Sequence, residues 1–373
     1  MKTSIFISLS LFLSVCIYGQ TVTTITQGSP NDAISIDGGG NIYAAYYHAT
    51  EGKVFKYDAS WNVSTFFESP NSCLGLATNA MEQVYNCDGN GNTIRMFQPD
   101  GTLFATFPAV GFPADIVNVP GSEDMIFSTY SGNTINRLEP DGTITTISND
   151  PLLDGPVGIA QDEVGGLYVG NYNNRKIYKV NNDGTLEYIA TVGSMGNLGY
   201  IAYAQGMLWG TVLQEHKIYM IDPNNTDDVT LFAGSSNGTM DGDISVATFS
   251  GPNGITFNET GDTMYITEYN TQNIRIISNI QLGTETFKKS NVTIITPLNT
   301  NEIVIHARFP EKGSVPITIY NVFGQTVYEK DLTTDQQNFV EKINTSTWAH
   351  GVYVAKLKLG GSSVTKKILI KNK

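Results

Sequence analysis

Hydrophobic and polar residues alternate in a five-residue pattern that recurs six times along the chain. The second residue of each copy is valine or isoleucine, and successive copies are 40, 41, 42, 41 and 56 residues apart. Alternation of this kind with β-branched residues predicts a strand. Short strands that repeat about every 40–50 residues are typical of β-propeller blades. The copies are KVFKY at 53–57, TIRMF at 93–97, TINRL at 134–138, KIYKV at 176–180, KIYMI at 217–221 and NIRII at 273–277.

Each repeat adds three further strand signals in a fixed order. An apolar strand comes first, as at 155–160, and a Gly- or Asn-rich turn follows, as at 37–41. An aromatic-bearing strand such as 167–168 then precedes the recurring pattern, and an Asp-Gly turn leads to a Thr-rich fourth strand. Gly and Asn supply the positive φ that tight hairpins require. We count six such units, which start near Pro30, Pro70, Pro113, Gly155, Asn197 and Gly251.

The sixth repeat lacks a convincing fourth strand, whereas the chain has an unassigned strand before the first repeat. Residues 21–25 (TVTTI) nearly duplicate 143–147 (TITTI), which is a fourth strand. We therefore expect the N-terminal strand to be the outer strand of the last blade, which would close the ring and hide its edges. The fold expected is all-β, with a six-bladed β-propeller over residues 20–280.

The first 19 residues are typical of a secretory signal peptide. Lys2 is followed by an apolar run from Ile5 to Ile17, which is short for a membrane span, and no transmembrane segment is expected elsewhere. Cys16 raises the alternative of a lipoprotein, although Val15 stands where a small residue is usual. The signal peptide is the preferred interpretation.

Charge divides the chain into two parts. Residues 1–290 carry 12 Lys+Arg and 29 Asp+Glu (12 − 29 = −17), whereas residues 291–373 carry 10 and 6 (10 − 6 = +4). This asymmetry predicts two domains, with a linker at 281–290. The acidic larger part argues against nucleic acid as a partner, since phosphate binding needs a basic surface.

The repeats resemble those of the NHL family. The residues that carry the resemblance are 155–177, with GPVGI and NRKI, and 241–255, which is similar to the linker and first strand of many NHL blades. The sixth repeat also resembles gluconolactonase-like propellers, through GPNGI at 251–255 and MYITE at 264–268. These resemblances imply a six-bladed propeller.

The segment 291–373 has several strand-like runs that predict a small β-sandwich. IYNVFGQTV at 319–327, WAHGVYV at 348–354 and TKKILIK at 365–371 resemble the C-terminal sorting domain of the type IX secretion system of Bacteroidetes. The resemblance implies that the type IX machinery is a partner and that the protein reaches the cell surface or the extracellular space. An ordinary accessory β-domain is the alternative.

Candidate site residues are expected on one face of the propeller, where loops lead into the inner strands and the second strands end. We assign Asn31, Asp32, Asp88 and Asn171 to a ligand face. Oxygen ligands suit Ca²⁺ or Mg²⁺ as a possible cofactor. The candidate metal ligands are Asp115, Asn253 and Glu268, of which Asn253 is implied by the gluconolactonase-like resemblance. The alternative for all of these is turn hydrogen bonding.

Histidine and cysteine offer few further candidates. His48 and His216, expected near the same face, are candidate general bases. Cys73 and Cys87 flank a hairpin of the second repeat and would form either a disulfide or two separate buried thiols. The recurring tyrosines are interpreted as core residues.

Two functions remain open. The preferred one is an exported module that binds an unknown ligand, protein or glycan and catalyses nothing. The alternative is a metal-dependent hydrolase or lyase of the gluconolactonase-like type, which needs several oxygen ligands converging on one ion.

Overall fold

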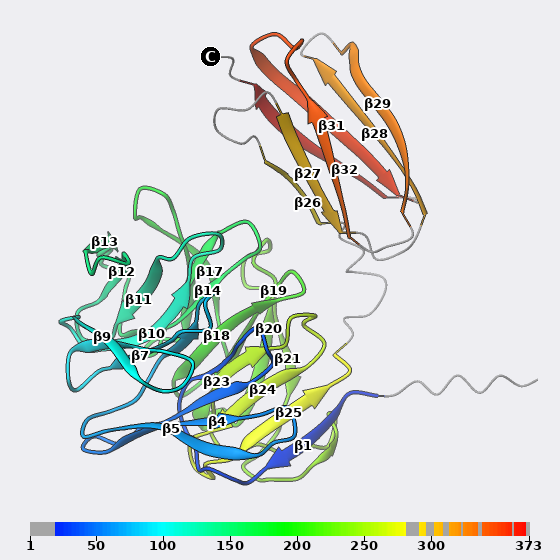
Figure 1. The fold of residues 1–373 in the computed structure, drawn as a ribbon. Helices are drawn as coiled ribbons and strands as arrows, with labels where there is room; N and C mark the ends of the chain where they lie inside the picture. The colour runs from blue at the N-terminus through cyan, green and yellow to red at the C-terminus, as the bar shows by residue number, and fades with distance from the viewer. Residues whose placement is uncertain are drawn as a thin grey trace, which may run out of the picture. The chain divides into compact units, whose positions relative to one another are not determined.

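The computed structural model describes residues 19–280, 291–295, 302–308, 313–321, 324–334, 338–359 and 362–370. The chain divides into two compact units, residues 1–281 and 282–373 (Figure 1). Most of the predicted signal peptide (1–18) and the predicted linker (281–290) lie outside the described residues.

The larger unit is built almost entirely of antiparallel strands, as the sequence predicted. Its described residues form six sheets, numbered here 1 to 6 in chain order. Sheets 1 to 5 each have four strands in sequential order. Sheet 1 holds β2 (Ile34–Ile36), β3 (Ile42–Tyr46), β4 (Gly52–Tyr57) and β5 (Val63–Ser69); sheet 2 holds β6 (Leu76–Thr78), β7 (Val84–Asp88), β8 (Thr93–Phe97) and β9 (Leu103–Pro108). Sheet 3 holds β10 (Pro113–Asn118), β11 (Met125–Thr129), β12 (Thr134–Leu138) and β13 (Ile144–Ser148); sheet 4 holds β14 (Pro156–Gln161), β15 (Leu167–Asn171), β16 (Lys176–Val180) and β17 (Leu186–Thr191). Sheet 5 holds β18 (Leu198–Ala204), β19 (Met207–Val212), β20 (Lys217–Ile221) and β21 (Val229–Ala233), with the 3₁₀ turn η1 (Leu213–Glu215) before β20.

Sheet 6 joins the two ends of the larger unit. Its strand order is β22-β1-β25-β24-β23. The N-terminal strand β1 pairs antiparallel with β25 over its whole length, from Thr21 opposite Ser278 to Ile25 opposite Ile274. The predicted pairing of the N-terminal strand with the last repeat is therefore confirmed. The strands are β1 (Thr21–Ile25), β22 (Gly242–Asp243), β23 (Pro252–Phe257), β24 (Met264–Glu268) and β25 (Ile274–Ser278).

The first strands of the six sheets, called the inner strands here, contact one another in a cycle. The order is β2, β6, β10, β14, β18, β23 and back to β2. Four of these strands shift register near their start, the first between Pro113 and Ile116 and the last between Pro252 and Ile255. A bulge of this kind re-aims the side chains at the extra positions. Asp115, Tyr200 and Asn253 occupy such positions.

Hydroxyl groups connect neighbouring sheets close to the inner strands. Ser128 of β11 donates to the carbonyl of Val157 at 2.9 Å, and Thr211 of β19 donates to that of Asn253 at 2.6 Å. Thr267 of β24 occupies the equivalent position and donates to the carbonyl of Asp32. The third bond joins sheet 6 to sheet 1 and so ties the end of the repeat array to its beginning.

The smaller unit consists of two antiparallel sheets that share a core. The sheet orders are β26-β27-β30 and β29-β28-β31-β32. Alternate apolar residues of both sheets, such as Ile305 and Ile319, form one buried cluster, as period-two strands require. The strands are β26 (Asn291–Ile295), β27 (Glu302–Arg308), β28 (Gly313–Asn321), β29 (Thr326–Thr334), β30 (Asn338–Asn344), β31 (Gly351–Leu359) and β32 (Ser362–Ile370). Among the described residues of both units, no helix is long and apolar enough to span a membrane.

Candidate functional site

A group of polar side chains lies buried where the inner strands meet. Asp32, Asn253 and Tyr200 are each no more than 5% exposed. Asn253 donates from Nδ2 to Oδ2 of Asp32 at 3.2 Å, and the Tyr200 hydroxyl donates to Oδ1 of the same carboxylate. The three residues come from sheets 1, 5 and 6, so the cluster exists only in the assembled ring.

Asp115 is a second buried carboxyl group on this axis, contributed by sheet 3. It is 5% exposed, and its two oxygens accept backbone hydrogens from Ile116 and Ile159, both at 2.9 Å. Ile159 belongs to β14, so this carboxyl also bridges two neighbouring sheets. No Lys or Arg of the described residues forms an ion pair with Asp115 or Asp32.

Burial dominates the titration of both groups, because a charged carboxylate is poorly solvated inside the protein. It raises the pKa of Asp32 to about 6, against hydrogen bonds from Tyr200, Ala33 and Asn253 that favour the ionised form. It raises the pKa of Asp115 to about 8, and the negative charge of Asp32 adds to that shift. Burial also raises the pKa of the Tyr200 hydroxyl, with Asp32 as the next contribution.

Tyrosines surround this cluster at one repeated position, the residue directly after the second strand of a sheet. Four of the six sheets have tyrosine there, and we call Tyr47, Tyr130, Tyr172 and Tyr269 the tyrosine rim. In three of them the backbone N–H donates to the carbonyl of the residue just before the inner strand of the same sheet. These bonds run from Tyr130 to Phe112, from Tyr172 to Gly155 and from Tyr269 to Gly251. The N–H of Tyr47 donates instead to Oδ1 of Asn31 at 2.7 Å. All four therefore lie at the same end of their sheets.

The rim residues are near one another and near Asp32. The rings of Tyr130 and Tyr172 have centroids 6.0 Å apart, and Phe112 lies 6.0 Å from Tyr130. Burial raises the pKa of Tyr47, followed by the charges of Asp32 and Tyr269. Burial likewise raises the pKa of Tyr172, and Tyr130, Tyr269, Asp32 and Tyr47 contribute after it.

The rim is only partly buried and forms an aromatic surface at one end of the ring. Tyr47, Tyr130 and Tyr172 are half-buried, and Tyr269 is 44% exposed. The tyrosines that recur within the second strands, such as Tyr43, Tyr85 and Tyr168, are buried core residues as the sequence predicted, whereas the rim tyrosines are only partly buried. The missed signal was the recurrence of tyrosine immediately after the second strand.

Two of the predicted site residues are used in ion pairs inside their own sheets. Glu268 binds Arg275 at 2.9 Å with both side chains fully buried, and Asp88 binds Arg95 with the Asp88 side chain fully buried. In both sheets the arginine follows the acidic residue by seven positions, so the pair joins the end of the second strand to the third. Both carboxylates hold the sheet together and face no open space.

Asn31 and Asn171 have local partners as well. Nδ2 of Asn31 donates to the carbonyl of Tyr47 at 3.2 Å, which fixes the backbone of that rim residue. Nδ2 of Asn171 donates to the carbonyl of Leu152 at 2.8 Å, and its Oδ1 is buried without a partner among the described residues. Of the predicted ligand-face residues, Asn31, Asp32 and Asn171 lie next to the rim, the last directly before Tyr172 in the chain.

The two candidate bases have different partners. His216 has a left-handed backbone (φ 59°) at the end of η1, and its Nδ1 accepts the N–H of Gly251 at 3.0 Å. His48 is exposed, with Nδ1 3.4 Å from the Thr50 hydroxyl. Cys73 and Cys87 are free, buried thiols, and burial raises the pKa of both. Of the two alternatives for the cysteines, the structure has the separate thiols.

The three predicted metal ligands do not converge on one point. Asp115 is bound to two backbone N–H groups, Asn253 to Asp32, and Glu268 to Arg275. Within the described ranges, no three His, Cys, Asp or Glu side chains come together in a way that could hold a metal ion. The carboxylate oxygens of Asp115 and Glu268 thus have protein partners, and the three residues do not form the set of converging oxygen ligands that Ca²⁺ or Mg²⁺ needs.

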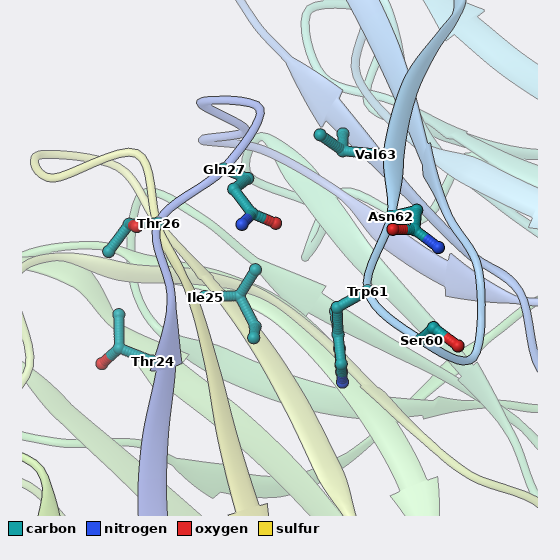
Figure 2. A pocket seen from close by; sticks show the side chains of 8 residues that line it. All are labelled: Thr24, Ile25, Thr26, Gln27, Ser60, Trp61, Asn62 and Val63. Carbon is teal, nitrogen blue, oxygen red and sulfur yellow. The ribbon is translucent and has the colours of Figure 1, made fainter.

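A groove of about 440 Å³ lies elsewhere on the larger unit (Figure 2). It shares no residue with the buried cluster or the tyrosine rim. Its lining comes from the end of β1 and the turn between β4 and β5: Thr24, Ile25, Thr26, Gln27, Ser60, Trp61, Asn62 and Val63.

The larger unit shares its fold with solved structures of several functions, all below 25% identity. A streptogramin B lyase is 15% identical with a TM-score of 0.53, covering 70% of this chain and 98% of its own. A gluconolactonase from Xanthomonas campestris is 15% identical with a TM-score of 0.53, covering 69% and 89%. An auxiliary nutrient binding protein from Bacteroides thetaiotaomicron is 14% identical with a TM-score of 0.60, covering 69% and 76%.

Two family models match separate parts of the chain. Residues 124–285 match a repeat of unknown function (DUF6923), and residues 297–371 match the secretion system C-terminal sorting domain. No curated protein matches the sequence. The predicted sorting domain and its localisation are confirmed. The chain therefore ends in a type IX secretion sorting domain that directs export to the cell surface or beyond, and its larger unit has the fold of gluconolactonase-like β-propellers.

Proposed function

We propose that the protein is an exported binding module that holds a small ligand at the tyrosine rim. In this proposal the six sheets are the blades of one propeller, closed by β1 and followed by a small β-sandwich for sorting. A signal peptide over residues 1–19 would serve the first membrane crossing. The ring gives the rim a rigid support, which lowers the entropy cost of binding.

The observation that carries the proposal is the position of the rim above buried carboxyl groups that already have partners. Four partly exposed tyrosines at equivalent positions give a ligand flat apolar area with hydroxyl groups at its edge. Asp32 beneath them is held by Tyr200 and Asn253. The aromatic surface is therefore open to a ligand, whereas the groups able to act on one are engaged. The fold likeness to nutrient binding proteins is compatible with this.

A metal-dependent hydrolase or lyase of the gluconolactonase-like type is the second candidate, favoured by the meeting of Asp32 and Asn253 on the axis. To take up Ca²⁺ or Mg²⁺, the carboxyl oxygens of Asp32 and Asp115 would have to exchange their present hydrogen-bond partners for the ion. This requirement ranks the enzyme below the binding module.

Thermal shift of the full chain tests the proposal with a panel of oligosaccharides, dipeptides and nucleosides. We expect at least one compound to raise the Tm of the wild type and of Tyr188→Ala, and to leave the Tm of Tyr172→Ala and Tyr269→Ala unchanged. Tyr188 is the matched control because it lies on β17, away from the rim. A compound that shifts the rim variants as much as the wild type would contradict the proposed site.

The same samples separate the two candidates. Glucono-δ-lactone hydrolysis is measured with Ca²⁺ and with EDTA in the wild type and in Asn253→Ala. Turnover that needs Ca²⁺ and is lost in Asn253→Ala would establish the second candidate in place of the first.

A further inference from the structure

The groove shown in Figure 2 lies at the junction between sheet 6 and sheet 1, where the ring closes. Residues 24–27, at the end of β1, form one side, and residues 60–63, from the turn before β5, form the other. Its volume of about 440 Å³ is within the range of about 300–1,000 Å³ found for small-molecule sites.

Trp61 occupies a position in this turn where the turns of sheets 2, 3 and 4 have glycine. The equivalent turns of sheets 2, 3 and 4 have Gly101, Gly142 and Gly184, with φ of 87°, 90° and 83°. Trp61 has φ of 63° and makes the same backbone hydrogen bond, from its N–H to the carbonyl three residues earlier. A left-handed backbone costs a residue with a side chain roughly 1–2 kcal/mol. The sequence thus has a bulky residue where the fold favours glycine.

Two of these glycines lie against a backbone carbonyl of the preceding sheet. A Cβ on Gly101 would lie 2.8 Å from the carbonyl oxygen of Phe66, and one on Gly184 would lie 2.4 Å from that of Ile147. Both carbonyls belong to the outer strand of the preceding sheet. For Trp61 the corresponding fourth strand of the preceding sheet is β1, and the groove lies between the end of β1 and this turn.

The turn that presents Trp61 is fixed by Asp58. One oxygen of this carboxylate accepts the N–H groups of Ser60 at 2.8 Å and Asn62 at 2.9 Å, and the other accepts the Asn62 amide at 2.8 Å. Tyr57 and Tyr265 approach the indole at interplanar angles of 62° and 52°. Neither tyrosine ring is stacked parallel to the indole, and Trp61 is only partly buried.

The chemistry of the lining selects a class of ligand. The groove is lined by three hydroxyl groups, two side-chain amides, one indole and two aliphatic side chains, with no charged side chain. Hydroxyls and amides pair with neutral polar groups, and an indole packs against a flat apolar face. A pyranose ring has both, with C–H groups on one face and hydroxyls around its edge. We propose that this groove, distinct from the tyrosine rim, binds a neutral pyranoside unit of a saccharide.

Ligand-observed NMR on the full chain tests the proposal with methyl α- and β-pyranosides of glucose, galactose and mannose, and with cello- and maltotetraose. We expect saturation transfer to at least one of them, and loss of at least tenfold in affinity in Trp61→Gly. Glycine is the residue found in the turns of sheets 2, 3 and 4, so the variant relieves the backbone while removing the indole. Gln27→Ala, at an exposed position, keeps Trp61 and should weaken the same sugar severalfold.

Two controls keep the result decisive. Tyr172→Ala, on the rim, should bind the sugar as the wild type does, which separates this site from the proposed function. If Trp61→Gly fails to fold, Gln27→Ala decides by the loss or retention of binding. Absence of transfer to every sugar at about 20 mM, where even millimolar affinity would show, overturns the proposal. Unchanged binding in Gln27→Ala and in a folded Trp61→Gly also overturns it.

Discussion

The Tyr200 hydroxyl donates a hydrogen bond to the carboxylate of Asp32, which lies 168 positions earlier in the chain. Tyr200 stands in the bulge of β18 and Asp32 just before β2, so the bond joins sheets 5 and 1, which are not neighbours in the cycle of inner strands. Both groups are almost fully buried. The bond therefore fixes two distant repeats to each other through the middle of the ring.

The first prediction concerns the pH dependence of stability. The pKa of Asp32 is raised by burial to about 6 and that of Asp115 to about 8, from an ordinary value of 3.8. A raised folded-state pKa means that folding favours the protonated form. The associated stability is present below about pH 4 and is lost as pH rises through 6 and 8. A tenfold change in proton affinity on folding corresponds to about 1.4 kcal/mol, so the wild type should lose several kcal/mol between pH 4 and 9.

Asp115→Asn should flatten this dependence, because the amide stays neutral at all pH values. The difference in Tm, variant minus wild type, should therefore increase from pH 5 to pH 9 in calorimetric scans. Asp183→Asn is the control, since Asp183 lies in an exposed turn. A difference between Asp115→Asn and wild type that stays constant with pH would mean that Asp115 is ionised when folded.

The second prediction concerns the buried arginine of sheet 6. Arg275 contacts Glu268 and Asp241 at 2.9 Å each, the carbonyls of Thr248 and Met240, and the ring of Phe249. Arg275→Met would leave Glu268 buried without a counter-charge, which costs about 3–5 kcal/mol. Urea unfolding should show this loss, and residues 238–250 should become sensitive to protease because their contacts run through the guanidinium.

Two further variants define the cause. Arg137→Met removes an ion pair with Asp124 whose side chains are 39% and 20% exposed, and should cost less than about 1 kcal/mol. Arg275→Met combined with Glu268→Gln should recover part of the loss, because no buried charge remains. If the double variant is as unstable as Arg275→Met, lost packing and not the unpaired charge is responsible.

The fold was predictable from sequence because its signals are local. The repeat spacing, the turn glycines and the likeness of residues 21–25 to 143–147 required no knowledge of partners, and they predicted the pairing of β1 with β25. The site was less predictable because its residues are defined by partners far along the chain. Glu268 was assigned to a metal although Arg275, seven residues later, was visible as a counter-charge. The contact of Asp32 with Tyr200 had no such signal.

The third prediction concerns stability in acid. Glu215 is buried, which raises its pKa, but hydrogen bonds from Tyr219, Ser194 and Met195 outweigh burial and hold the pKa at about 2. A lowered folded-state pKa contributes stability above the ordinary value of 4.5 that is lost as pH falls toward 2. Glu215→Gln should cost about 2 kcal/mol at pH 7, and the deficit should shrink between pH 4.5 and 2. Chemical unfolding across this range measures the deficit, with Glu187→Gln at an exposed position of β17 as the control. A deficit independent of pH would refute the ionic origin.

The last prediction concerns the hydroxyl bond that closes the ring. Thr267 donates to the carbonyl of Asp32 and accepts the N–H of Gly254 at 2.9 Å, and it is fully buried. Thr267→Val keeps the shape but leaves both backbone groups unpaired, which should cost about 1–3 kcal/mol. Because this bond joins the last sheet to the first, hydrogen exchange should also rise in β1 and β2. Thr145→Val, at an exposed position of β13, should change neither quantity. If Thr267→Val loses this stability but exchange in β1 and β2 is no faster, the hydroxyl supports sheet 6 alone and does not close the ring.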